Sequence, residues 1–220
     1  MMTPIVDVTQ PVALVGGAEV APKVLNILQT LTDVVIAADG GADHLVAFGP
    51  NPSKVIGDLD SISEAARQKF ASQLVHVRDQ DSTDLEKVLQ RVKAPVLIGA
   101  GFLGGRLDHT FAALSAVVRY PAQPLVLIDE VDCCFRCPDA GVVFALPIGT
   151  ALSVLPMDSI QATTEGLQWD MKGLALKPAG AVSSSNRTAA AEVHIAVTGP
   201  AIITLPLAQL PHAIDAVRAR

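Results

Sequence analysis

The stretch VVIAADGGADHL, residues 34–45, decides the fold class of this chain. Its first five residues form a continuous apolar run, which is typical of a strand buried on both faces of a parallel sheet. The run stops at Asp39-Gly40-Gly41, and residues 42–48 favour a short helix. A buried strand that passes through a glycine turn into a helix predicts an α/β unit.

The same alternation continues through the first 130 residues. Short apolar runs predict strands at residues 12–15, 54–56, 74–77, 96–98 and 125–128. Apolar residues at helical spacing lie between them, at 24–31, 64–70, 83–92 and 107–120. Thr83 and Glu86 have the spacing of a capping box, which marks a helix start. This repeated alternation predicts a parallel sheet covered by helices.

The pattern changes near residue 130. Strand-like runs without helices between them lie at 141–145, 152–155, 173–176, 193–197 and 202–205, and residues 183–186 have the composition of a polar loop. The tail, 208–220, favours a helix. We therefore expect an α/β fold class with two domains, an N-terminal parallel-sheet domain at 1–130 and a C-terminal antiparallel β-sandwich at 131–220.

The composition excludes several classes of protein. No apolar run reaches the ~18 residues of a membrane-spanning helix, and the N-terminus lacks the basic start and apolar stretch of a signal peptide. The net charge of −6 argues against a broad nucleic-acid surface. We expect a cytoplasmic protein with neither membrane nor nucleic acid as a partner.

Three cysteines lie close together, at Cys133, Cys134 and Cys137. The last two form a C-x-x-C pair, which can bind a metal or carry redox chemistry. A structural zinc site needs four ligands, usually from a second pair, and this sequence has no second pair. Buried thiols in a strand and turn are the favoured interpretation.

The stretch GAGFLGGRLDH, residues 99–109, contains a G-x-G-x-x-G pattern directly after an apolar run. In dinucleotide-binding proteins an acidic residue about 20 positions later binds the ribose. Here Asp129 comes 30 positions after Gly99 (129 − 99), which is too far. Asp108 would also repel a pyrophosphate unless Arg106 or a metal ion accompanied it. These features disfavour NAD binding.

Six aspartates follow the predicted strands of the first domain: Asp39, Asp58, Asp60, Asp79, Asp81 and Asp84. Aspartates are common in turns and at helix starts, which is the alternative explanation for each one singly. Ligands of open parallel sheets bind beyond the carboxyl ends of the strands, so these side chains are expected to converge there. Clustered carboxylates need cations, and Mg²⁺ is usually held by carboxylates and substrate phosphates. The pattern predicts a magnesium–nucleotide site.

Glycines and one arginine fit the same interpretation. Gly40-Gly41 and Gly104-Gly105 would leave room for phosphates and expose backbone N–H groups. Arg106 would supply positive charge to the phosphate oxygens. The alternative for Arg106 is a simple ion pair with Asp108.

These stretches together resemble the thiamine pyrophosphokinase family. The resemblance rests on ADGGADHL (38–45), VIGDLDSI (55–62), DQDSTDLEKVL (79–89), GAGFLGGRLDHT (99–110), TTEGLQW (163–169) and VSSSN (182–186), in the order of the family. Leu59 stands where the family usually has Phe, a difference that we interpret as one of packing.

The resemblance implies an enzyme that transfers the terminal diphosphate of ATP to the hydroxyethyl group of thiamine, giving thiamine diphosphate and AMP. It implies Mg²⁺ held by Asp58, Asp60 and Asp84, which with Arg106 form the catalytic set. ATP would be bound by residues of the first domain, namely Asp39, Gly40, Gly41, Gly104, Gly105, Arg106 and Asp108. Thiamine would be bound by Trp169, Ser185 and Asn186, in a homodimer whose active site lies at the interface.

Several alternatives remain open on the residues alone. Trp169, the one tryptophan of the chain, is either an exposed platform for a flat cationic ring or a core residue of the sandwich. Asp58-Leu59-Asp60 is also a D-x-D pattern, which a nucleotide-sugar transferase would use to hold a metal and a diphosphate. A non-enzymatic sensor of thiamine or nucleotide is the third interpretation, although the complete set of aspartates speaks against it.

Overall fold

The computed structural model describes residues 3–218, apart from the side chains of Ala47 and Phe48. Contacts within the chain divide it into two compact units. Unit 1 comprises residues 1–116 and 122–130, and unit 2 comprises residues 117–121 and 131–220. Each unit contains buried hydrophobic residues of its own.

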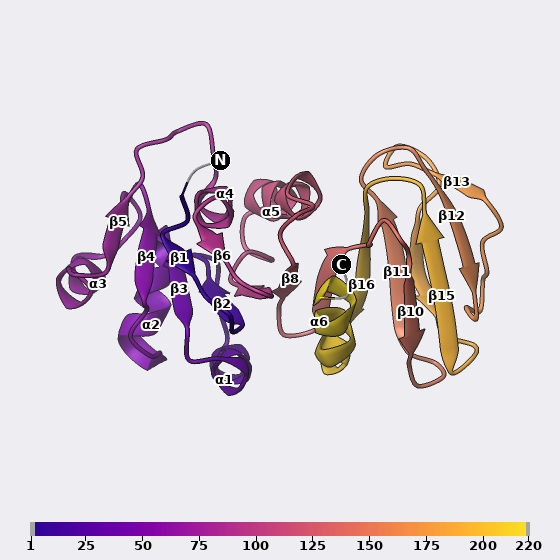
Figure 1. The fold of residues 1–220 in the computed structure, drawn as a ribbon, viewed down its shortest axis with the longest axis horizontal. Helices are drawn as coiled ribbons and strands as arrows, with labels where there is room; N and C mark the ends of the chain where they lie inside the picture. The colour runs from indigo at the N-terminus through magenta and orange to yellow at the C-terminus, as the bar shows by residue number, and fades with distance from the viewer. Residues whose placement is uncertain (1–2, 219–220) are drawn as a thin grey trace. The chain divides into compact units, whose positions relative to one another are not determined.

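Unit 1 is built on a parallel sheet. Its strands, in spatial order, are β8 (Leu125–Ile128), β7 (Leu97–Ala100), β2 (Val12–Val15), β3 (Val35–Ala38), β4 (Lys54–Gly57) and β5 (Leu74–His76) (Figure 1). Every residue of β2, β3, β7 and β8 is buried. This burial explains why these strands are continuous apolar runs in the sequence.

Helices connect the strands of unit 1: α1 (Pro22–Leu31), α2 (Ala42–Phe48), α3 (Glu64–Lys69), α4 (Asp84–Leu89) and α5 (Leu107–Arg119). The predicted capping box is present at the start of α4, where Thr83 and Glu86 bond each other's backbone N–H groups. Helix α1 packs on β2 and β7, and α4 packs on β3 and β4. The short strands β1 (Val6–Asp7) and β6 (Val92–Lys93) form a separate parallel pair.

The order of the strands creates one switch point in the sheet of unit 1. From β2 the chain adds β3, β4 and β5 in one direction, and it then returns to add β7 and β8 on the other side of β2. Loops that leave β2 and β7 therefore diverge, and a crevice opens between them at the carboxyl ends of the strands. This is the position at which α/β sheets bind ligands.

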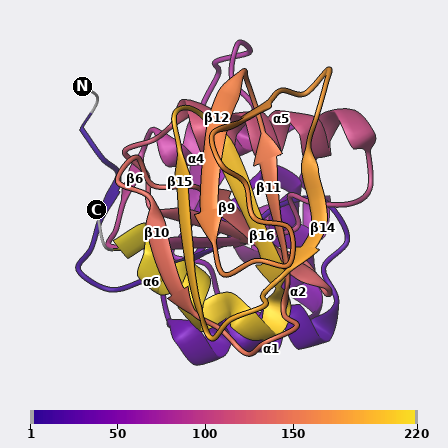
Figure 2. The same ribbon diagram turned by 90° about the vertical axis from the view of Figure 1, so that its right-hand side faces the viewer.

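Unit 2 consists of antiparallel strands (Figure 2). One set pairs in the order β14 (Ser183–Arg187), β11 (Ala151–Pro156), β16 (Ala201–Pro206) and β9 (Asp132–Arg136). The other pairs in the order β10 (Val142–Ala145), β15 (Glu192–Val197), β12 (Ile160–Glu165) and β13 (Leu174–Leu176). The expected fold class, a parallel-sheet α/β part followed by an antiparallel β part, is confirmed.

Three strands of unit 2 differ from the sequence prediction. Residues 183–187 form β14 rather than a loop, because their backbone pairs with β11 despite their polar side chains. Strand β12 was not predicted, and β9 was expected only as a strand that holds the buried cysteines, without bounds. Strand β12 alternates buried and exposed residues, a period-2 signal weakened by its two threonines and its alanine.

The remaining features of unit 2 follow the sequence. Cys133, Cys134 and Cys137 are all buried, as the favoured interpretation required. The tail forms α6 (Leu210–Arg218), preceded by a 3₁₀ turn, η2 (Leu207–Gln209), and the last two residues of the predicted helix lie outside the described range. Within residues 3–218, no helix is long and apolar enough to span a membrane.

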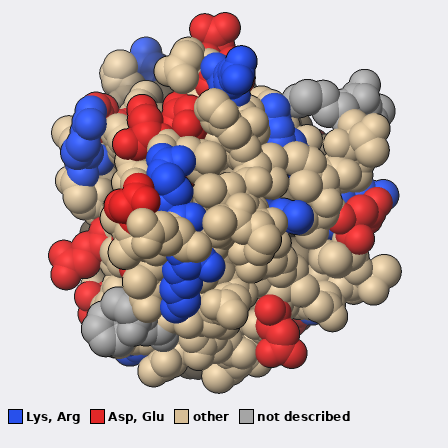
Figure 3. Space-filling view, turned by 90° about the vertical axis from the view of Figure 1, so that its left-hand side faces the viewer, with Lys and Arg blue, Asp and Glu red and all other residues tan. Residues whose placement is uncertain are grey.

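The surface of unit 1 has no single sign of charge on the face that Figure 3 presents. Lys and Arg side chains lie interspersed with Asp and Glu side chains on that face. Mixed charge of this kind differs from the basic face that a broad phosphate-backbone contact needs.

Candidate active site

A cavity of about 800 Å³ lies at the switch point of unit 1. Its walls are the segments that follow β2, β3, β4 and β7, together with the first turns of α4 and α5. The lining includes all the unit 1 residues predicted for catalysis and ATP binding except Gly41 and Asp108, both of which adjoin lining residues. The volume falls in the range of small-molecule and cofactor sites.

Asp39 is the most deeply placed carboxylate of this cavity. It directly follows β3, has a φ of 45°, and is only 1% exposed. Its Oδ2 accepts a hydrogen bond from the Ser61 N–H at 3.2 Å, whereas its buried Oδ1 has no partner. Burial raises the pKa of Asp39, and the nearby charge of Asp84 raises it further. A buried carboxylate oxygen without a partner is costly, which points to a bound cation.

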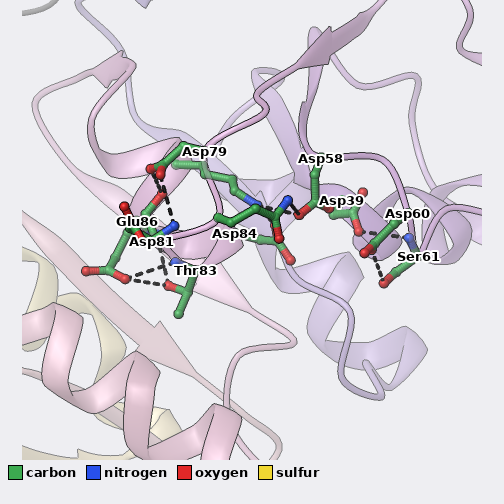
Figure 4. A network of polar contacts seen from close by, with 12 residues as sticks. Asp39, Asp58, Asp60, Ser61, Asp79, Asp81, Thr83, Asp84 and Glu86 are labelled. Carbon is green, nitrogen blue, oxygen red and sulfur yellow. Dashed lines mark hydrogen bonds and ion pairs between the residues drawn. The ribbon is translucent and has the colours of Figure 1, made fainter.

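Asp39 lies beside two further carboxylates. One oxygen from each of Asp39, Asp58 and Asp60 lies within 4.8 Å of the others, and Figure 4 shows the three side chains gathered at the carboxyl ends of β3 and β4. Oxygen ligands of this kind, with the unpartnered Oδ1 among them, fit a hard divalent cation such as Mg²⁺. The structure thus favours Asp39 as a third ligand beside Asp58 and Asp60.

The turn between Asp58 and Asp60 is strained. Leu59 has a φ of 64°, a conformation that costs a non-glycine residue roughly 1–2 kcal/mol. Its side chain is buried, and its carbonyl accepts a hydrogen bond from Arg67 Nη2 at 2.5 Å. The burial of the side chain fits the interpretation of Leu in place of Phe as a packing difference, and Arg67 holds the turn from α3.

Asp84, predicted as a metal ligand, pairs with a lysine. Its Oδ1 binds the ammonium of Lys87 at 3.1 Å, and the same ammonium binds Asp58 Oδ2 at 2.9 Å. The hydrogen bond from Lys87 lowers the pKa of Asp58, whereas burial raises that of Asp84. Asp84 lines the cavity but is outside the group of three, so its role as a metal ligand stays a prediction.

Lys87 was missed by the sequence analysis. It is only 2% exposed, although a lysine three residues into a helix usually lies in solvent. Burial by itself lowers its pKa, but the hydrogen bonds to Asp58 and Asp84 outweigh burial and raise the pKa. The available signal was its position three residues after Asp84, on one face of the helix.

Two of the six aspartates do not reach the cavity. Asp79 accepts hydrogen bonds from the Ser82 hydroxyl and, at 2.9 Å, from the Asp81 N–H, and neither Asp79 nor Asp81 lines the cavity. The hydrogen bond from Ser82 lowers the pKa of Asp79. For this pair, the general role of aspartates in turns is the better explanation.

The four predicted glycines divide into two kinds. A Cβ atom at Gly41 would lie 2.0 Å from the Val15 carbonyl oxygen, so close packing against β2 requires this glycine. Gly40, Gly104 and Gly105 line the cavity. Gly104 and Gly105 have φ angles of 73° and 64°, and a Cβ atom at Gly104 would meet nothing within 4 Å. Glycines with positive φ beside a cavity are a feature of phosphate-binding loops.

Arg106 forms the ion pair that was its alternative explanation. Its Nη2 lies 2.6 Å from Asp108 Oδ2, and both side chains are largely exposed. This hydrogen bond lowers the pKa of Asp108 to about 2. Because the pair is exposed it contributes little to stability, and Arg106 retains N–H donors for an anionic ligand.

Trp169 in unit 2 is 55% exposed, which excludes the core interpretation. Its backbone is held by Asn186: the Trp169 N–H donates to Oδ1 at 3.2 Å, and Nδ2 donates to the Trp169 carbonyl at 2.9 Å. Asn186 is buried, and Ser185 has a φ of 58°. Asn186 therefore positions the tryptophan loop, while Ser185 and the indole remain accessible to a ligand.

The chain thus combines a parallel α/β unit, whose acidic cavity lies where such sheets bind nucleotides and other ligands, with a following antiparallel β unit. Two family models match the chain: "Thiamin pyrophosphokinase, catalytic domain" over residues 25–127 and "Thiamin pyrophosphokinase, vitamin B1 binding domain" over residues 144–202. The chain belongs to the thiamin pyrophosphokinase family.

Individual thiamine pyrophosphokinases are similar to this chain in sequence and in structure. Thiamine pyrophosphokinase 1 of Arabidopsis thaliana is 29% identical, over 79% of this chain and 78% of that protein. The thiamin pyrophosphokinase structure from Candida albicans superposes with a TM-score of 0.78 at 17% identity, over 90% of this chain and 89% of that one. The yeast structure gives a TM-score of 0.76 at 18% identity, over 99% and 92% of the two chains. The two structural matches show the shared fold.

Proposed function

We propose that this chain is a thiamine diphosphokinase, which transfers the terminal diphosphate of ATP to the hydroxyethyl group of thiamine and releases AMP. Family membership supports thiamine and ATP as the substrates. The observation that carries the catalytic part is the cluster of Asp39, Asp58 and Asp60, with its buried, unpartnered Asp39 oxygen in the cavity at the switch point.

The residues of the cavity fit Mg²⁺, which Asp39, Asp58 and Asp60 would hold, with Asp84 as the further predicted ligand. When bound, the ion supplies positive charge to the phosphate oxygens of ATP. Gly104 and Gly105 present backbone N–H groups to the phosphates, and Arg106 adds its guanidinium. The chain thus contributes charge neutralisation and positioning, which are the main requirements of this class of transfer.

The proposal implies one chemical step. The hydroxyl oxygen of thiamine attacks the β-phosphorus of ATP, a new O–P bond forms, and the bond from the β-phosphorus to the oxygen of the α-phosphate breaks. AMP leaves with that oxygen, and the hydroxyl proton passes to a base. The acidic residues of the cavity supply the candidates for this base.

The two parts of the chain have separate tasks in this proposal. Residues 1–130 bind ATP, including Asp39, Gly40, Gly41 and Asp108, and residues 131–220 bind thiamine. The exposed Trp169 stacks on a ring of thiamine, and Ser185 and Asn186 lie near the pyrimidine. The enzyme acts as a cytoplasmic homodimer, with its active site at the interface of the two subunits.

The first test is product analysis. Purified protein is incubated with thiamine, ATP and Mg²⁺, and the products are separated by chromatography. Equimolar thiamine diphosphate and AMP are the expected products. ADP with thiamine monophosphate would contradict the attack on the β-phosphorus, although both ligands would then use the proposed pocket.

Two further outcomes favour the rival interpretations. Binding of thiamine and ATP without any product would indicate a sensor. Turnover of a nucleotide sugar without any dependence on thiamine would indicate a transferase that uses the D-x-D pair. A reaction with EDTA in place of Mg²⁺ serves as the control, because the proposal expects no product there.

A further inference from the structure

A buried ammonium group lies inside the acidic cluster of unit 1. Lys87 Nζ is 2.9 Å from Asp58 Oδ2 and 3.1 Å from Asp84 Oδ1, and the residue is 2% exposed. Helix α4, anchored by the capping box and packed on β3 and β4, carries both Lys87 and Asp84. The ammonium therefore has a fixed place between two carboxylates.

The positions of the four carboxylates divide the cluster into two sides that share Asp58 (Figure 4). On one side, Asp39, Asp58 and Asp60 approach closely enough to share a divalent ion. On the other side, Asp58 and Asp84 share the Lys87 ammonium. Asp58 thus contacts the Lys87 ammonium on one side and belongs to the group of three carboxylates on the other.

This arrangement resembles a two-metal site in which one ion is replaced by an amino group. Two-metal phosphotransfer sites hold ions about 3.5–4 Å apart, with carboxylates between them. A buried ammonium gives the same sign of charge and binds carboxylate oxygens, but it stays attached to the protein and needs no ion from solution.

We propose that Lys87 takes the place of a second divalent cation, joining Asp58 to Asp84 and limiting the nucleotide-free cluster to one divalent ion. The inference rests on the proposed function in one respect, that Asp39, Asp58 and Asp60 bind a divalent cation. Lys87 is a positioning residue in this scheme, since it acts through the two aspartates. Its removal opens a second cation position between them.

The test counts Mn²⁺ ions bound to the nucleotide-free protein, by the electron paramagnetic resonance signal of the free ion. Mn²⁺ prefers the same oxygen ligands as Mg²⁺. We expect one ion in the wild type and two in Lys87→Met. The double variant Lys87→Met/Asp84→Asn should return to one ion, because it lacks a ligand of the second position.

A matched control removes an equal charge elsewhere. Lys93 is exposed and pairs only loosely with Asp7, at 3.6 Å, so Lys93→Met should bind one ion. One ion in a natively folded Lys87→Met, judged by circular dichroism, would overturn the inference. Two ions in the wild type or in the double variant, or none in the wild type, would overturn it as well.

Thermal unfolding separates this role from a merely structural one. Lys87→Met leaves two carboxylates without their cation, so its unfolding midpoint in EDTA should fall below that of the wild type. Added Mn²⁺ should raise the midpoint of the variant more than that of the wild type. If the variant is unfolded in EDTA, Mn²⁺ should fold it, and a chain that stays unfolded with Mn²⁺ would contradict the inference.

The wild-type product assay distinguishes this inference from the proposed function. Thiamine diphosphate formation by the wild type, with one ion in Lys87→Met, would refute only the role of Lys87. Two ions in Lys87→Met, without thiamine diphosphate formation by the wild type, would refute only the proposed function.

Discussion

Asp39 combines properties that a residue selected for stability alone would not have. It is buried, its φ is positive, one of its oxygens has no partner, and its pKa is raised by burial and by neighbouring carboxylates. Each of these costs free energy in the metal-free fold. Strain at such a residue is typical of a functional site, where a ligand compensates for it.

Replacing Asp39 with Asn should therefore stabilise the metal-free protein. The neutral amide can keep the hydrogen bond from Ser61 and present its NH₂ group to Asp58 or Asp60. We expect a gain of about 1 kcal/mol in the free energy of unfolding, measured with urea in EDTA. We also expect Mg²⁺ to stabilise the wild type but not the variant.

The pH dependence of this gain follows from the raised pKa of Asp39. A raised carboxyl pKa means that the native state favours the protonated form, so wild-type stability falls as the pH rises through that pKa. The advantage of Asp39→Asn should be small below the ordinary carboxyl pKa of about 4 and should grow towards neutral pH. A constant advantage across this range would argue against charge as its cause.

Asp60 is the more exposed member of the group of three, and it makes a hydrogen bond with the Ser61 hydroxyl at 2.9 Å. Asp60→Asn removes one charge from the cation site without leaving a buried cavity. We expect turnover to fall at least about a hundredfold, as when a group that stabilises transition-state charge is removed. Steady-state kinetics at saturating Mg²⁺ provides the measurement, with circular dichroism as the control for folding.

Near-normal turnover of Asp60→Asn would show that this carboxylate is not an essential ligand. A loss of turnover that higher Mg²⁺ restores would instead assign Asp60 to ion affinity alone.

At the scale of elements, helix α4 positions two of the charged residues of the site. This short helix carries Asp84 and Lys87, and its first turn is fixed by the capping box of Thr83 and Glu86. The helix packs on β3 and β4, the strands that Asp39 and Asp58 directly follow. The position of the helix therefore sets the separation between its own charged groups and the carboxylates of the sheet.

Thr83→Ala should weaken both the fold and the cation site. Loss of the N-cap costs about 1 kcal/mol. If the free energy of Mg²⁺ binding weakens by the same amount, the affinity for Mg²⁺ falls about fivefold. Calorimetric titration with Mg²⁺ and urea unfolding are the two measurements.

A core variant in unit 2 serves as the matched control for Thr83→Ala. Ile203 is fully buried in β16, and Ile203→Val costs a comparable ~0.5–1.5 kcal/mol. Its Mg²⁺ affinity should equal that of the wild type. Equal affinities in all three proteins would show that the cap stabilises the helix without positioning the cation ligands.

At the scale of the whole molecule, the proposed activity needs both units. The carboxylates, glycines and Arg106 belong to unit 1, whereas Trp169, Ser185 and Asn186 belong to unit 2. The proposed homodimer allows each active site to combine unit 1 of one subunit with unit 2 of the other.

Mixing two variants, each altered in a different unit, tests this arrangement, provided that Trp169→Ala by itself has lost most of its activity. A heterodimer of Asp60→Asn and Trp169→Ala has two active sites. If each site combines unit 1 of one subunit with unit 2 of the other, one site carries both substitutions and the other carries neither. After subunits are exchanged at equal ratio, about half of the dimers are mixed and half of their sites are intact, so about one quarter of wild-type activity should return. Activity no higher than the mean of the two separate variants would place each site within a single subunit.

Local patterns in the sequence determined the fold class. Strands buried on both faces need continuous apolar runs, and α4 needs its capping box, so both are visible in residues a few positions apart. The acidic residues after the strands predicted an anionic cluster in the same way, because the carboxyl ends of parallel strands share one edge of the sheet. Family-specific stretches added the two substrates.

Only the tertiary structure decided which carboxylates meet. Asp39 enters the group of three and Asp84 turns to Lys87, while Asp79 and Asp81 stay in their own turn. Strand β14 likewise depends on pairing with β11, more than 25 residues away in sequence. The burial of Lys87 comes from the packing of α4 on the sheet. These outcomes depend on contacts between segments that are distant in the sequence, and a local sequence pattern does not determine such contacts.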